Sequence, residues 1–317
     1  MRKKHSRMQN QYCTFSYFYL KIKVRKEGNT MEYQTLNNGL KMPIVGFGVF
    51  RVPDKKECEE SVYQAIKAGY RLIDTAASYT NEDAVGAGVK RAIDEGICTR
   101  EDLFITSKLW LQDYGYENAK KGIETSMKLL GVDYIDLYLL HQPYGDYYGS
   151  WKAMEELYQQ GKIKAIGVCN FSPERFMDLY MNSLIHPMIN QLEFHPFYQQ
   201  KNQKCVLKQC DCLLEAWGPL NEGQRDIFHH PMLLDIAKKH QKSVSQIILR
   251  WHLENHIIAI PKTTHLKRMK ENIDIFDFQL DKEDKKQIEQ LDLCYSEIID
   301  HQNYMTAKWL NKYKIHD

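Results

Sequence analysis

The sequence lacks an uninterrupted apolar run of the roughly 18 residues that a membrane-spanning helix needs, so we expect no membrane association. Its most apolar N-terminal stretch, residues 13–24, is interrupted by Ser16, Lys21 and Lys23, and no small-residue cleavage site of a secretory signal follows it. Segments rich in proline, glycine and serine, which would mark a linker between domains, are also absent. The sequence therefore predicts a single domain.

Metal-binding cysteine patterns are absent as well. The chain has eight cysteines, and they are scattered. Cys205, Cys210 and Cys212 lie close together, but their spacing is not that of a zinc site and no second ligand pair accompanies them. We therefore expect no metal, reduced thiols and a cytoplasmic location.

The charge shows no strong excess of one sign. The net charge is +2, but residues 1–30 carry eight Lys or Arg and one Glu, which leaves −5 on the remainder. The mildly acidic charge of the rest of the chain gives no reason to expect nucleic-acid binding. No feature of the sequence indicates an obligatory protein partner. Because a well-formed segment begins at Met31, we expect residues 1–30 to be a disordered extension and residues 31–317 to form the domain.

The sequence does contain a series of polar residues that end successive apolar runs. Asp74 follows RLI, Lys108 ends FITSK, His141 ends YIDLYLLH and Asn170 ends AIGVCN, at intervals of 34, 33 and 29 residues. Apolar runs that alternate with helices predict a parallel sheet. The carboxyl ends of such strands meet on one rim, where a (β/α)₈ barrel has its active site. The series therefore predicts both a fold and the place of the chemistry.

The patterns along the chain predict an α/β protein, a (β/α)₈ TIM barrel with an N-terminal β-hairpin and extra C-terminal helices. The hairpin covers residues 33–43, and Asn38-Gly39 indicates a type I′ turn. The expected strands are 44–50, 71–74, 103–107, 134–140, 164–169, 188–192, 213–217 and 257–260. The expected helices are 55–68, 82–95, 116–130, 150–160, 173–182, 200–209, 231–240, 243–254, 265–272 and 282–291.

Four residues on this rim suit general acid catalysis: Asp74, Tyr79, Lys108 and His141. A free tyrosine has a pKa near ~10, and a nearby ammonium such as that of Lys108 lowers it. The carboxylate of Asp74 would keep Lys108 charged, and His141 would hold a substrate oxygen.

Two other chemistries also suit these residue types. A lysine at the end of a barrel strand is typical of Schiff-base aldolases, for which Lys108 would be the nucleophile. A metal hydrolase would use His141, Glu193 and His195, although their spacing is not that of a known zinc site.

Longer segments resemble the aldo-keto reductases. They are GFGVF, RLIDTAASYTNEDAVG, ITSKLW, LYLLHQP, GKIKAIGVCNF, INQLEFHP, EAWGPL and IPKTTHLKRMKENIDIF, in the family's order from about Glu32 to Leu310. EAWGPL and HQPYGDYYGSW most resemble the bacterial branch that includes 2,5-diketo-D-gluconic acid reductases. The resemblance implies a (β/α)₈ barrel that reduces aldehydes and ketones with NADPH. Tyr79 would donate the proton, Asp74 and Lys108 would tune the pKa of Tyr79, and His141 would orient the carbonyl.

The resemblance also implies an NADPH site. Its residues would be Val49, Phe50, Asp74, Cys169, Asn170, Gln191, Trp217, Gly218, Leu220, Lys262, Thr263, Arg268, Glu271 and Asn272. Asn170 and Gln191 would hold the carboxamide, and Trp217 would stack on the nicotinamide. Lys262, Thr263 and Arg268 would take the 2′-phosphate, with Glu271 and Asn272 at the adenine. Cys169 departs from the usual serine, and a thiol is the weaker hydrogen-bond partner.

The resemblance leaves the substrate and one alternative open. His141, Trp110 and Phe50 would contact a small carbonyl substrate, and residues 295–313 would help to close the pocket. Potassium-channel β-subunits share the fold and act largely as binding partners. A non-enzymatic, NADPH-binding regulatory protein is therefore the alternative to a reductase.

Overall fold

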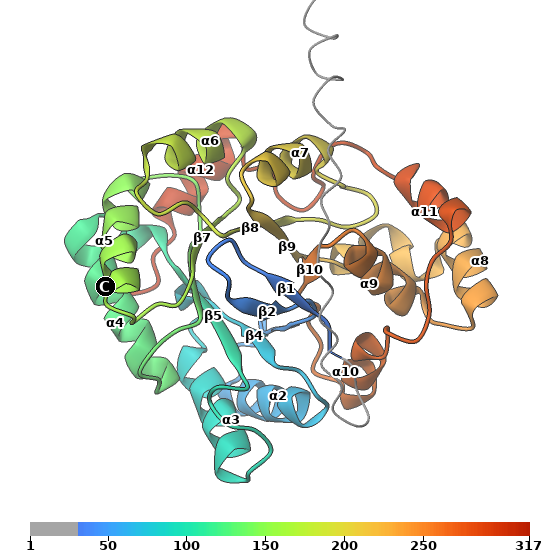
Figure 1. Ribbon diagram of the computed structural model, residues 1–317, viewed down its shortest axis with the longest axis horizontal. Helices are drawn as coiled ribbons and strands as arrows, with labels where there is room; N and C mark the ends of the chain where they lie inside the picture. Colours follow the sequence, from blue (N-terminus) through green and yellow to red (C-terminus); the bar gives the residue numbers. More distant parts are fainter. Residues whose placement is uncertain (1–30) are drawn as a thin grey trace, which may run out of the picture.

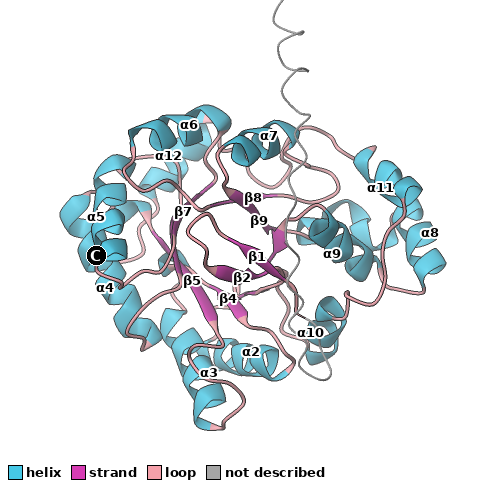
Figure 2. Cartoon of the chain, viewed as in Figure 1, coloured by secondary structure: helices cyan, strands magenta, loops and turns pink. Residues whose placement is uncertain are grey.

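Eight parallel strands form the centre of the computed structural model, which describes residues 31–317. The strands are β3 (Phe47–Gly48), β4 (Leu72–Asp74), β5 (Phe104–Leu109), β6 (Leu137–Leu140), β7 (Ile166–Cys169), β8 (Ile189–Glu193), β9 (Leu213–Trp217) and β10 (Ile258–Ala259). Each strand pairs in parallel with the next one along the chain. Figure 2 shows the strands at the centre with helices around them. The predicted α/β barrel is confirmed, whereas the predicted disordered extension, residues 1–30, lies outside the described residues.

The first and last strands also meet, which closes the sheet. Val45 pairs with Ala259, and the backbone N–H of Gly46 donates to the Ala259 oxygen at 2.8 Å. A Cβ atom on Gly46 would lie 2.5 Å from the Leu72 side chain and 2.9 Å from that of Ile260. Glycine is therefore required where the closing seam passes between two strands.

The predicted N-terminal hairpin is confirmed, but its turn is not of type I′. Strands β1 (Tyr33–Thr35) and β2 (Lys41–Pro43) pair antiparallel. Gly39 has φ +89°, whereas Asn38 has no positive φ, and type I′ requires both. The turn closes instead through a hydrogen bond from the Gly39 N–H to the Leu36 oxygen at 2.8 Å.

The side chain of Asn38 gives the reason for this turn and places the hairpin. Its Oδ1 accepts from the Leu40 N–H at 3.1 Å, and its Nδ2 donates to the Lys164 oxygen at 3.0 Å. Lys164 lies two residues before β7, so the hairpin covers the N-terminal end of the barrel (Figure 1). The polar residues lie at the opposite end of the barrel, where the strands finish.

Helices surround the barrel. They are α2 (Lys55–Lys67), α3 (Glu82–Asp94), α4 (Tyr116–Leu130), α5 (Tyr147–Gln159), α6 (Pro173–Asn182), α7 (Lys201–Gln209), α8 (Pro231–His240), α9 (Val244–Glu254), α10 (Leu266–Ile273), α11 (Lys282–Glu289) and α12 (Tyr304–Lys312). Helix α4 is typical: Ala119, Ile123, Ser126 and Leu130 are buried on one stripe, as a 3.6-residue period requires. Gly131, with φ +65°, then ends it. The sequence patterns did not predict α12, which is short and has only one buried residue, Leu310.

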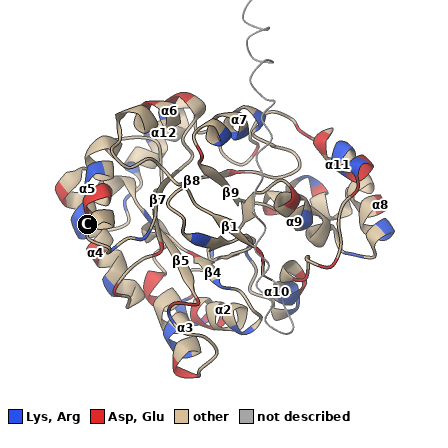
Figure 3. Cartoon of the chain, viewed as in Figure 1, with Lys and Arg blue, Asp and Glu red and all other residues tan. Residues whose placement is uncertain are grey.

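The outer surface carries both signs of charge, interspersed over the helices (Figure 3). All seven cysteines in the described part of the chain are free thiols. Within residues 31–317, every helix is too short or too polar to cross a bilayer.

Candidate active site

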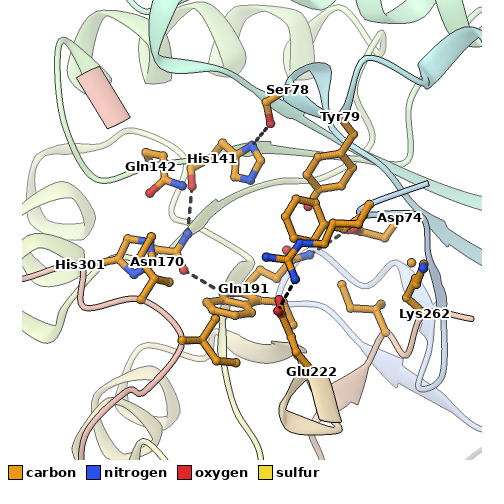
Figure 4. Close-up of a pocket in the computed structure, with 18 of the residues that line it drawn as sticks. Asp74, Ser78, Tyr79, His141, Gln142, Asn170, Gln191, Glu222, Lys262 and His301 are labelled. Atoms are coloured by element: carbon orange, nitrogen blue, oxygen red, sulfur yellow. Dashed lines mark hydrogen bonds and ion pairs between the residues drawn. The ribbon is translucent and has the colours of Figure 1, made fainter. Parts of the chain in front are cut away.

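The residues predicted for catalysis meet at the C-terminal end of the barrel, and Figure 4 shows Asp74, Tyr79 and His141 among them. Asp74 is the last residue of β4, Lys108 lies in β5, and His141 directly follows β6. Tyr79 ends η1 (Ala77–Tyr79), a short 3₁₀ helix after β4. Asp74, Tyr79 and His141 line a cavity of about 990 Å³. Lys108 lies behind its wall with a fully buried side chain.

The buried ammonium of Lys108 has three partners. Its Nζ donates to Asp74 Oδ1 at 2.6 Å and to the Thr75 oxygen at 2.8 Å, and it lies 3.5 Å from the Tyr79 hydroxyl. Burial alone lowers the pKa of Lys108, but the Asp74 carboxylate and neighbouring groups outweigh it and the pKa is raised. Because an amine must lose its proton to attack a carbonyl, this geometry does not support the Schiff-base alternative.

Tyr79 keeps its proton in this state. Burial raises the pKa of Tyr79, and Lys108 lowers it by less, so the pKa lies above its ordinary value. Lys108 therefore acts on the pKa of Tyr79 in the predicted direction, but the loss of water, which sequence reasoning did not count, outweighs it. The phenol ring lies 5.0 Å from the ring of Phe50 and 5.7 Å from that of His141.

His141 is neutral and has a partner that the sequence patterns did not reveal. Burial, then Lys108 and His301, hold the pKa of His141 well below its usual range. Its Nδ1 lies 3.2 Å from Ser78 Oγ. A serine hydroxyl that donates to Nδ1 leaves the ring proton on Nε2, which is the donor that a substrate oxygen needs. Ser78 has no signal in the sequence beyond its place before Tyr79.

A second buried carboxyl lies behind these residues. Gln191 Nε2 donates to Asp74 Oδ2 at 2.8 Å and to Glu215 Oε2 at 2.9 Å. Burial, and then the Asp74 charge, raise the pKa of Glu215 to about 8. Gln191 therefore also links two carboxyls. Glu215 was missed, although a glutamate inside the apolar run of β9 was an available signal.

About half of the predicted cofactor residues line the same cavity: Phe50, Asp74, Asn170, Gln191, Trp217, Gly218, Leu220 and Lys262. Trp217 Nε1 donates to Asn170 Oδ1 at 2.8 Å, and Asn170 Nδ2 donates to the His141 oxygen at 3.1 Å. Cys169 is buried, with its Sγ 3.9 Å from Gln191 Oε1. The amides are thus held at the wall beside the acid residues.

The remaining cofactor residues lie outside the cavity lining. Val49 and Thr263 are buried. On α10, which follows Lys262, Arg268 is exposed and Asn272 is buried. Glu271 lines a separate surface hollow. Of the predicted 2′-phosphate residues, Lys262 and Thr263 therefore lie between β10 and α10 and Arg268 lies on α10, and they do not all line one pocket.

The predicted substrate residues form the wall near His141. Trp110 lies with its ring 5.2 Å from that of His141, and its Nε1 donates to the Tyr313 oxygen at 2.8 Å. Phe50 is 45% exposed and lines the cavity. The C-terminal segment adds Trp309 and Leu310 from α12 to the lining. It therefore forms one wall of the cavity, whereas the sequence predicted that it would close the pocket.

An ion pair joins two loops at the cavity. Arg51 Nη1 lies 2.8 Å from Glu222 Oε2 in η3 (Asn221–His229), and both residues line the cavity. The sequence patterns did not reveal Arg51 as a partner of this loop.

The residues of the metal-hydrolase alternative have structural partners. His195 Nε2 lies 3.0 Å from Glu193 Oε1, and Ser296 Oγ donates to Glu193 Oε2 at 2.6 Å. Residues 31–317 contain no group of three or more His, Cys, Asp or Glu side chains placed to hold a metal. The pair of Glu193 and His195 instead anchors the segment that contains Ser296.

Comparison with known proteins points to the family that the sequence resembles. A model described as "Aldo/keto reductase family" matches residues 45–293. Uncharacterized oxidoreductase YtbE of Bacillus subtilis is 50% identical over 81% of this chain and 91% of its own. Glyoxal reductase of the same organism is 48% identical over the same shares, 81% and 91%. An aldo-keto reductase of Bombyx mori, solved in complex with NADP, matches with a TM-score of 0.80 and 37% identity over 84% of this chain and 94% of that one. With this match added to the barrel and to the residues at its rim, the chain belongs to the aldo/keto reductase family.

Proposed function

We propose that this protein reduces aldehydes and ketones to alcohols with NADPH as the hydride donor. The observation that carries this proposal is the buried chain of contacts from Asp74 through Lys108 to the Tyr79 hydroxyl, which ends in a cavity beside a neutral His141. Membership of the family, and the NADP complex of the Bombyx mori relative, support the choice of reaction and cofactor.

The cavity fits the proposed cofactor. When bound, NADPH supplies a hydride from C4 of its nicotinamide. Asn170 and Gln191 place amide groups at the catalytic end of the cavity, where they would bind the carboxamide, and Trp217 would stack on the ring. Gly218 and Leu220 line the path toward Lys262. Beyond it, Thr263 and Arg268 would take the 2′-phosphate, and Glu271 and Asn272 the adenine. The backbones of Val49 and Phe50 would border the first strand's side of the site.

Proton transfer follows from the same geometry. His141 would hold the carbonyl oxygen through Nε2, and Tyr79 would donate its proton to that oxygen as charge develops. The Lys108 ammonium, 3.5 Å from the tyrosine oxygen, would then stabilise the phenolate. Trp110, packed beside His141, would exclude water from the reacting carbonyl.

The test of this proposal is to follow the near-ultraviolet absorbance of reduced nicotinamide with purified protein, NADPH or NADH, and a panel of aldehydes, 2-oxoaldehydes and keto-sugars. Oxidation of NADPH that depends on a carbonyl is expected. Tight NADPH binding without turnover of any carbonyl would favour the non-enzymatic regulatory alternative. The best substrate would also test whether the chain belongs with the 2,5-diketo-D-gluconic acid reductases, which stays a prediction.

Arg268→Ala is expected to weaken NADPH binding by about 10-fold or more while changing NADH binding little. Only NADPH carries a 2′-phosphate, and a charge-assisted contact to it contributes roughly 1.5–3 kcal/mol. The measurement is the dissociation constant of each nucleotide by fluorescence titration. Lys270→Ala, which removes another exposed cation from the same helix, is the matched control. Equal losses for both nucleotides would show that Arg268 does not bind the phosphate.

Ser78→Ala is expected to lower kcat/KM by about 3- to 10-fold, because one hydrogen bond to a neutral group contributes on the order of 1 kcal/mol. Loss of the 3.2 Å contact lets the His141 proton move between Nδ1 and Nε2. Ser78→Thr keeps a hydroxyl and should retain most activity. The ¹⁵N chemical shifts of His141 distinguish the tautomers. An unchanged tautomer in Ser78→Ala would argue against this role.

A further inference from the structure

His301 presents an imidazole to the cavity that has no hydrogen-bond partner within residues 31–317. Its ring Nε2 is buried and unpaired, and only its backbone oxygen accepts a bond, from the Tyr144 hydroxyl. The residue lines the catalytic cavity, with its ring 6.5 Å from that of Trp217. Figure 4 shows it beside Asn170, on the opposite side of the pocket from Tyr79. A polar side chain in this position is available to a ligand.

The segment that contains His301 is firmly anchored. Ser296 Oγ donates to Glu193 Oε2 at 2.6 Å and accepts from the backbone N–H groups of residues 298 and 299 at 3.2 and 2.9 Å. The neighbouring Glu297 takes two contacts from Arg225, one of them at 2.8 Å between Nη2 and Oε1. With the Tyr144 bond at 2.5 Å, these contacts hold the backbone on both sides of the ring. The backbone that carries the imidazole is therefore preorganised, which lowers the entropic cost of binding.

The ring is neutral under ordinary conditions. Burial lowers the pKa of His301 to about 4, against an opposing effect of Asp300. A neutral imidazole has one donor and one acceptor nitrogen, so it suits a carbonyl or hydroxyl oxygen without demanding a charge. Since a buried polar group without a partner is unfavourable, a ligand that supplies one gains affinity.

The substrate fits the role of hydrogen-bond partner to His301 better than the cofactor does. Asn170 and Gln191 already provide amides for a carboxamide, and His301 and His141 line the same cavity. We propose that His301 binds a second oxygen on the carbon next to the reacting carbonyl, and that the preferred substrates are therefore neutral vicinal dicarbonyl or hydroxycarbonyl compounds. This inference rests on the proposed carbonyl reduction.

Charge at the site argues for neutral compounds over 2-oxo acids. Asp300, adjacent to His301, also lines the cavity. The cationic side chains of the lining are Arg51, which is paired with Glu222, and Lys262. Figure 4 places Lys262 away from His301. A substrate carboxylate beside His301 would therefore meet an acidic neighbour, while the cations of the described lining are either paired, as Arg51 is, or lie away from it, as Lys262 does.

The experiment compares methylglyoxal with propanal, which differ by one oxygen on the carbon beside the aldehyde. Both are assayed with NADPH on the wild type, His301→Leu and His301→Gln. For His301→Leu, kcat/KM for methylglyoxal is expected to fall by about 10- to 100-fold, as for loss of a hydrogen bond at a desolvated site. For propanal it should stay within about threefold, because propanal has no oxygen to lose. His301→Gln, which keeps a donor and an acceptor, should recover most of the loss.

Three outcomes would overturn the inference. The first is an equal loss of kcat/KM for both aldehydes in His301→Leu. The second is a larger dissociation constant for NADPH in that variant, which would assign the ring to the cofactor. The third is a wild-type preference for propanal, or for the anion glyoxylate, over methylglyoxal. Thermal unfolding of each variant checks that it folds. If folded, NADPH-bound wild type turns over no carbonyl at all, the proposed function itself fails, which is a result distinct from these three.

Discussion

Tyr79→Phe is expected to lower kcat by about 100- to 10,000-fold, the usual contribution of a positioned general acid. The substitution removes only the hydroxyl that lies 3.5 Å from Lys108 Nζ and keeps the ring that packs against Phe50 and His141. The dissociation constant for NADPH should therefore change little. Single-turnover oxidation of NADPH, together with nucleotide binding by fluorescence, measures the two quantities separately.

The matched control for this variant is Tyr304→Phe. Tyr304 is 79% exposed, so loss of its hydroxyl should leave turnover unchanged. Near-normal turnover by Tyr79→Phe would exclude Tyr79 as the proton donor. In that case His141 would be the remaining candidate, although its depressed pKa makes it a poor source of protons at neutral pH.

Lys108→Met is expected to lower the free energy of unfolding by about 3–5 kcal/mol, as when one partner of a buried ion pair is removed. Lys108 and Asp74 are 0% and 2% exposed, and their Nζ–Oδ1 distance is 2.6 Å. Methionine fills a similar volume but leaves the carboxylate without its counter-ion. Turnover should also fall strongly, because the group that lowers the pKa of Tyr79 is gone. Urea unfolding measures the change in the free energy of unfolding.

The pH dependence of this loss separates charge from packing. Burial raises the pKa of Asp74, and Lys108 opposes that rise in the wild type. Without Lys108 the folded-state pKa lies higher still. The folded variant then binds a proton that the unfolded chain, with a pKa near ~3.9, releases. The destabilisation should therefore be smallest at low pH and grow as pH rises through the folded-state pKa, so it should be smaller at about pH 5 than at about pH 8.

Asp74→Asn in the Lys108→Met background is the test of the cause. The double variant removes both charges of the ion pair and leaves the Glu215 carboxyl as the remaining acid at this site. It should therefore recover much of the stability lost by Lys108→Met and lose the part of the pH dependence that comes from Asp74. A destabilisation that is equal at both pH values, or that Asp74→Asn does not relieve, would mean that the cost comes from packing and not from an unpaired carboxylate.

The site could be predicted in part because its principal residues are tied to the strands. Asp74, Lys108 and His141 end or directly follow regular apolar runs, and parallel strands bring such ends together whatever the loops do. Ser78 and His301 lie in irregular segments, and the second reaches the cavity only because Glu193 and Tyr144 anchor the C-terminal segment. No periodic pattern records such contacts.

The sequence by itself determined the barrel, its hairpin and the four residues at its rim, since alternation of apolar runs and helices is a local property with one common parallel arrangement. Only the tertiary structure decided the state of the site. Burial outweighs the ammonium at Tyr79, keeps His141 neutral and raises the pKa of Glu215. These effects depend on how much water the surrounding chain removes from each group, and that is a property of packing between segments that lie far apart in the sequence.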